Sequence, residues 1–437
     1  MMNYKESLVY LRDLTKFGFN FGLGRVEELL RRLGNPHKTM RYIHVGGTNG
    51  KGSISSMLNS MLTVNGDRPG LFTSPHLHSY RERFCIAGEK ISHEDVALCL
   101  NEIKPHVEAM IEDGFEQPTE FEVNAVLAFY YFAKQGVKNA VMEVGMGGEI
   151  DATNVISDTK VAILTNIALE HTEYLGDTKE KICLTKSGII KKGCHVLSGV
   201  VEPELRELLT RRTSEENALD VGFTGRNFTT EFVRSDADGQ YFNYRDKEVE
   251  YQNLYLPLQG LHQVENAALA VRAGRLWGLS EDVIREGLRK TVWPCRLEKV
   301  SEAPLTIIDG AHNDHGMGVL TSYLKEHYSD YEIIVLIGML ADKEREKAVA
   351  LLGPLTDQVV VTRPNSPRAG DFEMIAEFFQ PYCDHVYLEE KIPAAVELAK
   401  KLTAEAAAQG KEPLLLITGS LYMVADARGY LLGIESE

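Results

Sequence analysis

The sequence lacks several features that would assign it to a common class of protein. Its six cysteines are scattered and none belongs to a C-x-x-C pair, so neither a zinc knuckle nor a disulfide framework is predicted. Its apolar runs, such as VAILTNIAL and PLLLITG, are far too short to span a bilayer. It has no internal repeat and no low-complexity segment. We therefore expect free thiols, a cytoplasmic location and no association with a membrane.

The chain also lacks an excess of positive charge. Its 47 lysine and arginine residues face 63 aspartate and glutamate residues, which gives a formal net charge of −16. This balance argues against a nucleic-acid partner and against an anionic membrane surface. A substrate with several negative charges must therefore meet a local basic patch. The first residues, MMNYKESLVYLRDL, are typical of an amphipathic helix and not of a signal peptide.

The length of 437 residues exceeds one typical hydrophobic core and favours two domains. Apolar strands and helical stretches alternate up to about residue 190, as in a parallel α/β sheet. Residues 221–257 read instead as hairpins around a D-G turn. We predict an α/β fold. A P-loop parallel-sheet ATPase domain with a small β-hairpin insertion covers 1–296, and a smaller Rossmann-like α/β domain covers 297–437.

The stretch HVGGTNGKGS, residues 44–53, has the character of a phosphate-binding loop with unusual spacing. Lys51 follows Gly50, but Val45 occupies the place of the first glycine in the common P-loop pattern, and Ser53 comes one place late. An apolar strand precedes the glycines and helical spacing follows them. That order directs backbone N–H groups and a helix N-terminus at an anion. The alternative is a tight strand-to-helix turn with a solvated lysine.

Polar residues also follow three other predicted strands. Ser74 ends PGLFTS, Glu143 ends AVM, and His171 follows VAILTNIALE. Because ligands of open parallel sheets bind at the carboxyl ends of the strands, we expect these groups beside the glycine-rich loop. Oxygen and imidazole ligands next to phosphates suit a divalent cation carried by a nucleotide. Taken singly, the glutamate reads as a solvated strand end and the histidine as a packed or surface residue.

A set of ordered motifs then extends from about residue 18 to 425. They are GTNGKGS, TSPHL, EVGMGGEIDATN, TNIALEH, TKSGIIKKG, HQVENAALA, WPCRLE, DGAHN, GMLADKE and TGSLY. Together they resemble the folylpolyglutamate synthase and dihydrofolate synthase family, a branch of the Mur ligase superfamily. The loop of this superfamily has the shorter spacing seen here.

The resemblance implies an ATP-dependent ligase that uses two Mg²⁺ ions. The residues implied for ATP are Gly47, Thr48, Asn49, Gly50, Lys51, Gly52, Ser53, Asn266, Arg296 and Asp309. Those implied for the metal are Ser74, Glu143, His171 and Lys186. The last matches a lysine that the family carbamylates, whereas by composition alone it would be a solvated cation. The residues implied for catalysis are Lys51, Lys186, His171 and His312.

The resemblance also implies the substrates, a folate or dihydropteroate and L-glutamate. The acid would be activated as an acyl phosphate and then attacked by the glutamate amine. The implied substrate residues are Phe21, Arg25, Phe121, Glu122, Asn124, Glu149, Asp151, His312 and Ser420. We expect a monomer with small-molecule substrates alone, and no nucleic-acid or membrane partner.

The sequence departs from the family pattern near the expected pterin pocket. Gly24 stands where a glutamate is common, Asn124 where a hydroxyl residue or glycine is common, and Glu149 where a basic residue is usual. Two alternatives to a folate ligase stay open, and these changes motivate the first of them. One is a ligase of the same superfamily with a non-folate acid. The other is an inactive nucleotide-binding regulator, against which the intact DGAHN motif, Lys186 and His171 argue.

Overall fold

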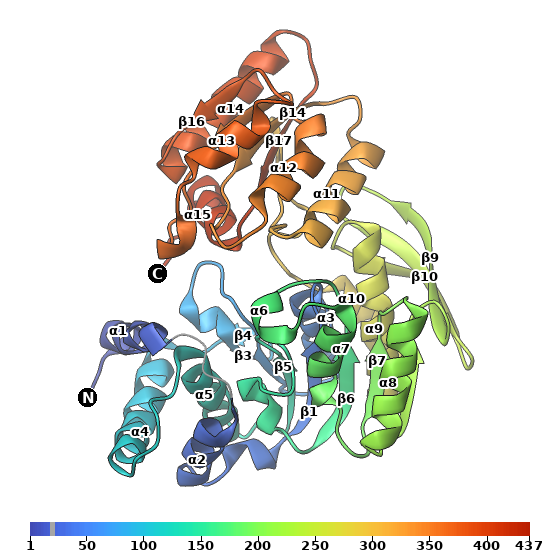
Figure 1. Ribbon diagram of the computed structural model, residues 1–437. Helices are drawn as coiled ribbons and strands as arrows, with labels where there is room; N and C mark the ends of the chain where they lie inside the picture. Colours follow the sequence, from blue (N-terminus) through green and yellow to red (C-terminus); the bar gives the residue numbers. More distant parts are fainter. Residues whose placement is uncertain (18–21) are drawn as a thin grey trace. The chain divides into compact units, whose positions relative to one another are not determined.

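The structure, a computed structural model, describes residues 1–17 and 22–437 (Figure 1). It divides into two compact units. Unit 1 consists of Met1–His76, Arg81–Pro257 and Gln263–Val292. Unit 2 consists of Leu77–Tyr80, Leu258–His262 and Trp293–Glu437. The chain therefore passes through unit 2 for two short segments before it remains there.

The main sheet of unit 1 has eight strands among the described residues, in the order β4-β3-β2-β5-β1-β6-β7-β8. In that order the strands are Glu89–Lys90, Phe84–Ile86, Gly70–Phe72, Asn139–Glu143, Arg41–Gly46, Thr159–Leu164, His195–Ser198 and Asp220–Phe223. From β2 to β8 all neighbours pair in parallel, whereas β3 and β4 form an antiparallel edge.

Burial explains why β1 forms the centre of this sheet. After the exposed Arg41, all residues of β1 are buried. A near-continuous apolar run is typical of a parallel strand covered on both faces. The strand leads into α3 (Lys51–Val64), which packs against β1, β2 and β5. The strand therefore fixes the position of the glycine-rich loop between it and α3.

The remaining helices of the first 292 residues surround this sheet. They are α1 (Tyr4–Leu14), α2 (Gly24–Arg32), α4 (His93–Glu112), α5 (Glu120–Lys134), α6 (Thr172–Leu175), α7 (Lys179–Lys186), α8 (Pro203–Glu215), α9 (Leu261–Trp277) and α10 (Glu281–Arg289). A separate antiparallel sheet has the order β11-β10-β9, formed by Glu250–Leu256, Gln240–Asp246 and Phe228–Ser235. It matches the predicted hairpin insertion and its turn at Asp238 and Gly239.

Unit 2 contains a six-stranded sheet in the order β12-β13-β17-β14-β15-β16 among the described residues. Its strands are Glu298–Glu302, Leu305–Ile308, Pro413–Thr418, Glu332–Ile337, Gln358–Val361 and Val386–Leu388. Its helices are α11 (Asp314–His327), α12 (Arg345–Leu352), α13 (Glu373–Phe379), α14 (Ile392–Ala408) and α15 (Leu421–Leu432). All strand pairs are parallel except that of β12 with β13.

The side-chain alternation of β14 shows how the sheet of unit 2 is covered. Val335 belongs to a core with residues of α11, α12 and α13, whereas Ile334 and Leu336 belong to a core with residues of α14 and α15. Successive side chains of a strand point to opposite faces, so the sheet is buried on both sides. This three-layer arrangement confirms the predicted α/β class.

The structure adds elements that the sequence interpretation did not contain. The antiparallel pair β3–β4, the strands β7 and β8, and the edge strand β12 were not expected. The predicted boundary between domains after residue 296 stays a prediction, and the division between the two compact units falls at Val292 and Trp293. Within residues 1–17 and 22–437, no helix has the length and apolar character needed to cross a membrane.

Candidate active site

The polar strand ends predicted from the sequence meet at one edge of the unit 1 sheet. Strands β2, β5, β1 and β6 are consecutive neighbours and run in parallel, so their carboxyl ends share that edge. Ser74 follows β2, Glu143 ends β5, and His171 comes after β6. The glycine-rich loop follows β1. In open α/β sheets this edge is where ligands bind.

Two glycines let the loop after β1 approach its neighbours closely. Gly47 has φ 124°, and a Cβ there would lie 1.9 Å from Oγ1 of Thr165. Gly50 has φ 88°, and a Cβ there would lie 2.5 Å from Oδ1 of Asn266. Both positions therefore require glycine for conformation as well as for space. Asn266, implied for adenine, is thereby placed against the loop.

Hydrogen bonds fix the backbone of this loop at the N-terminus of α3. Asn166 accepts the N–H of Thr48 on its carbonyl oxygen and the N–H of Asn49 on Oδ1, both at 2.8 Å. Nζ of Lys51 donates to the carbonyl oxygens of Gly47 at 3.1 Å and Thr48 at 3.0 Å. The ammonium group is thus held over the loop, at the N-terminus of α3, where an anion is favoured. Gly52 and Ser53 lie in the first turn of that helix and are buried.

Ser74 and Glu143 are brought into contact. The backbone N–H of Ser74 donates to Oε2 of Glu143 at 3.1 Å. Glu143 is only 5% exposed at the end of β5. The chemistry of this donor set, a serine hydroxyl beside a carboxylate, fits Mg²⁺, which prefers oxygen ligands.

Lys186 is the least expected member of the site, because its side chain is 2% exposed. Its Nζ donates to the carbonyl oxygen of Gly47 at 2.9 Å and to Oε1 of Glu170 at 2.9 Å. Burial lowers the pKa of Lys186, and the charge of Glu170 opposes this shift only in part. Burial alone would raise the pKa of Glu170, but the charges of Lys186 and Lys51 outweigh this effect and lower the pKa to about 2. This lysine is therefore a buried group against the phosphate loop and not a solvated cation.

His171 lies next to this pair at the start of α6. It is exposed and its backbone is left-handed, with φ 47°. A non-glycine residue with positive φ is uncommon and marks a tight local constraint. Among the described residues, no group of three or more His, Cys, Asp or Glu side chains is arranged to hold a metal ion. The predicted ligand set has only two such residues, Glu143 and His171, and its other members are Ser74 and Lys186.

The residues implied for the acid substrate have mixed surroundings. Arg25 forms a buried ion pair with Glu122, with Nη2 2.9 Å from Oε1, and a second pair with Glu116 at 3.0 Å. Glu122 also accepts the N–H of Thr119 at 2.7 Å and so caps α5. Phe21 lies outside the described residues. Arg25 and Glu122 thus have a structural function within unit 1, beyond any contact with a substrate.

The next implied residues line the loop that follows β5. The ring of Phe121 packs so closely on Gly145 that a Cβ added there would lie 2.3 Å from Cζ of the ring. Asn124 is fully buried, and its Nδ2 lies 3.4 Å from Oε1 of Glu120. Glu149 is exposed. Burial lowers the pKa of Lys191, and the charge of Glu149 opposes this shift in part.

Asp151 is buried and engaged with its own loop. Its Oδ1 accepts the backbone N–H of Thr153 at 2.9 Å and the Thr153 hydroxyl at 2.5 Å, and Oδ2 accepts the N–H of Met146 at 2.9 Å. Burial raises its pKa and these hydrogen bonds oppose the shift. The hydroxyl of Thr153 also lies 2.8 Å from Nε2 of His44 in β1. Asp151 thus ties the loop after β5 to the strand that carries the phosphate loop.

In unit 2, Arg296 and Asp309 flank the start of the sheet. Asp309 accepts the N–H of Leu297 at 2.9 Å and that of Ala311 at 2.8 Å. Burial raises the pKa of Asp309, and the charge of Arg296 opposes this. Cys295 and Leu297, on either side of Arg296, both have left-handed backbone, with φ 57° and 48°. The guanidinium is therefore presented from a constrained segment.

His312 and Ser420 follow neighbouring strands of unit 2, β13 and β17. The N–H of Gly419 donates to the carbonyl oxygen of Ala311 at 3.1 Å, which joins the two segments. Nδ1 of His312 lies 2.9 Å from the carbonyl oxygen of Gly310, so it is the protonated nitrogen. Ser420 is 2% exposed, and its hydroxyl has no hydrogen-bond partner among the described residues. A buried hydroxyl of this kind is suited to a ligand.

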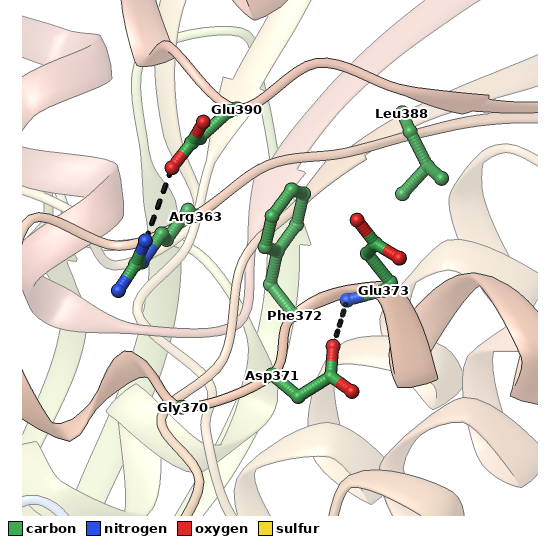
Figure 2. A pocket seen from close by; sticks show the side chains of 7 residues that line it. All are labelled: Arg363, Gly370, Asp371, Phe372, Glu373, Leu388 and Glu390. Atoms are coloured by element: carbon green, nitrogen blue, oxygen red, sulfur yellow. Dashed lines mark hydrogen bonds and ion pairs between the residues drawn. The ribbon is translucent and has the colours of Figure 1, made fainter.

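A cavity of about 470 Å³ opens at the same edge of the unit 2 sheet (Figure 2). It is lined by Arg363, Gly370, Asp371, Phe372, Glu373, Leu388 and Glu390. Its arginine is paired with Glu390 at 3.0 Å, as the dashed line in Figure 2 marks. The cavity is lined by these residues and not by those implied for substrates.

Comparison with known proteins identifies this arrangement. Residues 45–274 match the Mur ligase middle domain, and residues 295–421 match the Mur ligase glutamate ligase domain. The chain is 33% identical to the dihydrofolate synthase/folylpolyglutamate synthase of Bacillus subtilis, over 97% of this chain and 98% of that protein. It is also 33% identical to the folylpolyglutamate synthase of Lacticaseibacillus casei over the full length of both.

A solved structure is similar to this chain over its full length. The Mycobacterium tuberculosis folylpolyglutamate synthase complexed with ADP superposes with a TM-score of 0.92, at 32% identity, over 100% of both chains. The chain belongs to the folylpolyglutamate/dihydrofolate synthase family of Mur ligases. The predicted resemblance is thereby confirmed, and so are the predicted fold class and the predicted class of enzyme.

For this Mur ligase, the sequence interpretation missed two residues of the site. Glu170 is assigned no role by the sequence, yet it pairs with Lys186. Asn166 was not considered, yet it holds two N–H groups of the phosphate loop. Both lie in TNIALEH, a motif already recognised, but their contacts depend on the approach of β6 to β1.

Proposed function

We propose that this protein is an ATP-dependent amide ligase that adds L-glutamate to a folate-type carboxylate. The observation that carries the proposal is the position of Lys186, buried and 2.9 Å from the carbonyl oxygen of Gly47 in the phosphate loop. A protein that only binds nucleotide has no need of a buried lysine there. Lysine is rarely fully buried unless it is paired, and Lys186 is paired with Glu170 at 2.9 Å. Its place against the phosphate loop, and not its burial alone, therefore supports a role in the reaction.

In the proposed reaction, a carboxylate oxygen of the acid attacks the γ-phosphorus of ATP, which forms an acyl phosphate and releases ADP. The amine of L-glutamate then attacks the acyl carbon, an amide bond forms, phosphate leaves and the amine loses a proton. Lys51 offsets negative charge on the terminal phosphates while the carboxylate approaches. Gly47 to Ser53 and Asn266 are proposed to hold the nucleotide in unit 1. Arg296 and Asp309 remain proposed ATP residues on the ground of the family resemblance alone.

Ser74, Glu143, His171 and a carbamylated Lys186 are proposed to hold two Mg²⁺ ions. When bound, Mg²⁺ polarises phosphoryl oxygens and steadies the charge that develops on them. Carbamylation joins the neutral Nζ of Lys186 to the carbon of CO₂ and releases one proton. The buried surroundings favour this neutral form, since burial lowers the pKa of Lys186.

The incoming L-glutamate is proposed to meet His312 and Ser420. The unpartnered hydroxyl of Ser420 supports this role.

The acid substrate is proposed to lie near Arg25, Phe121, Glu122, Asn124, Glu149 and Asp151, with Phe21. Relatives at the same identity carry different names, one bifunctional and one for folylpolyglutamate synthesis alone. Both dihydropteroate and reduced folates therefore belong in the test. We also propose that the protein is a monomer.

The deciding experiment is ADP release by the purified chain with ATP, Mg²⁺ and L-glutamate. The acids to compare are dihydropteroate, tetrahydrofolate, its diglutamate and a simple aromatic acid. Glutamate-dependent ADP release with any of the first three supports the proposal. Turnover with the aromatic acid alone would indicate a ligase for a non-folate acid. Nucleotide binding without ADP release would indicate a regulator.

Lys51→Ala tests the phosphate-loop assignment in the same assay. The lysine acts on phosphate charge and not on packing, so we expect most of the activity to be lost while the fold survives. Lys400→Ala, which removes an exposed ion pair with Glu397 in α14, is the matched control. Near-normal turnover of Lys51→Ala would remove the assignment.

A further inference from the structure

Arg345 is a buried cation that the proposed reaction does not use. It begins α12 and is 7% exposed. Among residues 1–17 and 22–437, its guanidinium donates to backbone carbonyl oxygens: Nε to that of Leu340 at 3.0 Å and Nη2 to that of Met339 at 2.9 Å. Nη2 also donates to Ala369, and Nη1 to Asp371. A planar fork of five N–H donors is suited to collecting acceptors from two segments at once.

The two segments that Arg345 joins both follow strands of the unit 2 sheet. Residues 338–342 come after β14, and residues 366–371 come after β15. Further contacts tie them together, because the N–H of Ala341 donates to the carbonyl oxygen of Arg368 at 2.8 Å. Nη1 of Arg368 donates to Oδ2 of Asp342 at 3.3 Å. Carbonyls of irregular segments need such partners, so Arg345 fixes their positions.

The first of these segments lies against the one that carries Ser420. Gly419 has φ 110°, and a Cβ there would lie 2.9 Å from the carbonyl oxygen of Gly338 and 3.0 Å from Cγ of Met339. The second segment reaches the following helix, because the guanidinium of Arg368 lies 5.8 Å from the centre of the Tyr422 ring in α15. Both segments held by Arg345 therefore border the start of α15.

We propose that Arg345 is a positioning residue for the amino-acid half of the site: it holds residues 338–342 and 366–371 against the turn that presents Ser420. The inference rests on the proposed function, since it takes L-glutamate as the ligand near His312 and Ser420. Misplacement of a reacting group by about 1 Å can cost roughly a hundredfold in rate, even when the mutation lies far from the chemistry. Loss of Arg345 therefore affects L-glutamate and not ATP.

The test is steady-state kinetics of Arg345→Lys, which keeps the charge but cannot reach four carbonyls. We expect the KM for L-glutamate to rise about tenfold or more, with the KM for ATP and for the acid within about twofold of wild type. Arg363→Lys is the matched control, because Arg363 lies at the same sheet edge in an exposed pair with Glu390 (Figure 2). It should leave all three KM values unchanged.

A second variant tests the same inference in case Arg345→Lys does not fold. A Cβ on Gly370, which has φ 60°, would lie 2.6 Å from Cβ of Ala341, so Gly370→Ala moves the same segments while Arg345 remains. It should raise the KM for L-glutamate selectively as well. A KM for L-glutamate that is unchanged, or that rises together with that for ATP, in whichever variant folds would overturn the inference. Absence of glutamate-dependent ADP release in wild type would instead refute the proposed function.

Discussion

Nζ of Lys186 lies 2.9 Å from Oε1 of Glu170, so the buried lysine is paired with a carboxylate at the same sheet edge as the phosphate loop. The pair opposes carbamylation, because an ammonium group cannot react with CO₂ and Glu170 favours the ammonium form. Burial acts in the other direction and lowers the pKa of Lys186 overall. For the carbamylation proposed above, the balance between these two effects would set how much of the amine is neutral and able to react with CO₂.

We predict that activity depends on bicarbonate and that Glu170→Gln needs less of it. Removal of the carboxylate charge lowers the pKa of Lys186 further and increases the neutral amine. The measurement is ADP release against bicarbonate concentration at fixed pH, in carbon-dioxide-depleted buffer. Lys186→Ala should be nearly inactive and partly rescued by short carboxylic acids. Full activity of the wild type in depleted buffer, with electron density for an unmodified lysine beside two Mg²⁺ ions, would count against carbamylation.

Acid stability gives a second prediction for the same pair. The pKa of Glu170, about 2, lies below its ordinary value of 4.5. A carboxyl with a lowered pKa stabilises the folded state above its ordinary pKa, and this contribution is lost as the pH falls towards 2. In acid unfolding monitored by circular dichroism, wild type should lose stability relative to Glu170→Gln between about pH 4.5 and 2. Parallel curves over this range would contradict the assignment.

The buried pair of Arg25 and Glu122 gives a prediction on stability. Glu122→Gln leaves a buried guanidinium without its main counter-charge, which costs about 3 kcal/mol of unfolding free energy. Urea unfolding is the measurement. The control is Glu281→Gln, which removes an exposed pair with Arg285 within α10 and should have far less effect. Equal midpoints for both variants would show that Arg25 is adequately balanced by Glu116.

Glu149 tests specificity for the acid. A like charge near a substrate carboxylate costs about 1 kcal/mol when partly screened, or roughly a fivefold change in affinity. Glu149→Arg should therefore lower the KM for dihydropteroate, tetrahydrofolate and most of all its diglutamate. Glu149→Gln is the matched control and should produce a smaller change of the same sign. Unchanged KM values for all three substrates would mean that Glu149 does not face the acid substrate.

The glycine-rich loop could be placed from the sequence because its residues are consecutive. A strand, a run of glycines and a helix start fix the loop from 47 to 53 locally, and the parallel order of strands then places Ser74 and Glu143 beside it. The pairing of Lys186 with Glu170 could not be predicted in this way. It depends on how α7 returns to β6, and the burial that changes a lysine from solvated to reactive comes only from that packing. The role of Arg345 has the same origin, since its acceptors are backbone carbonyls, which leave no pattern in a sequence.

The repeated passage of the chain through unit 2 has a consequence for how this molecule can be divided. Leu77–Tyr80 belongs to unit 2, where Nη1 of Arg428 lies 3.0 Å from Nε2 of His78 and the same guanidinium binds Glu298. A polypeptide of residues 293–437 alone would lack that segment and Leu258–His262, although it would retain the whole sheet. The two units are therefore not exchangeable modules: a chimaera made with another Mur ligase at a single junction near residue 293 would keep Glu298 beside Arg428 but would replace the segment that carries His78.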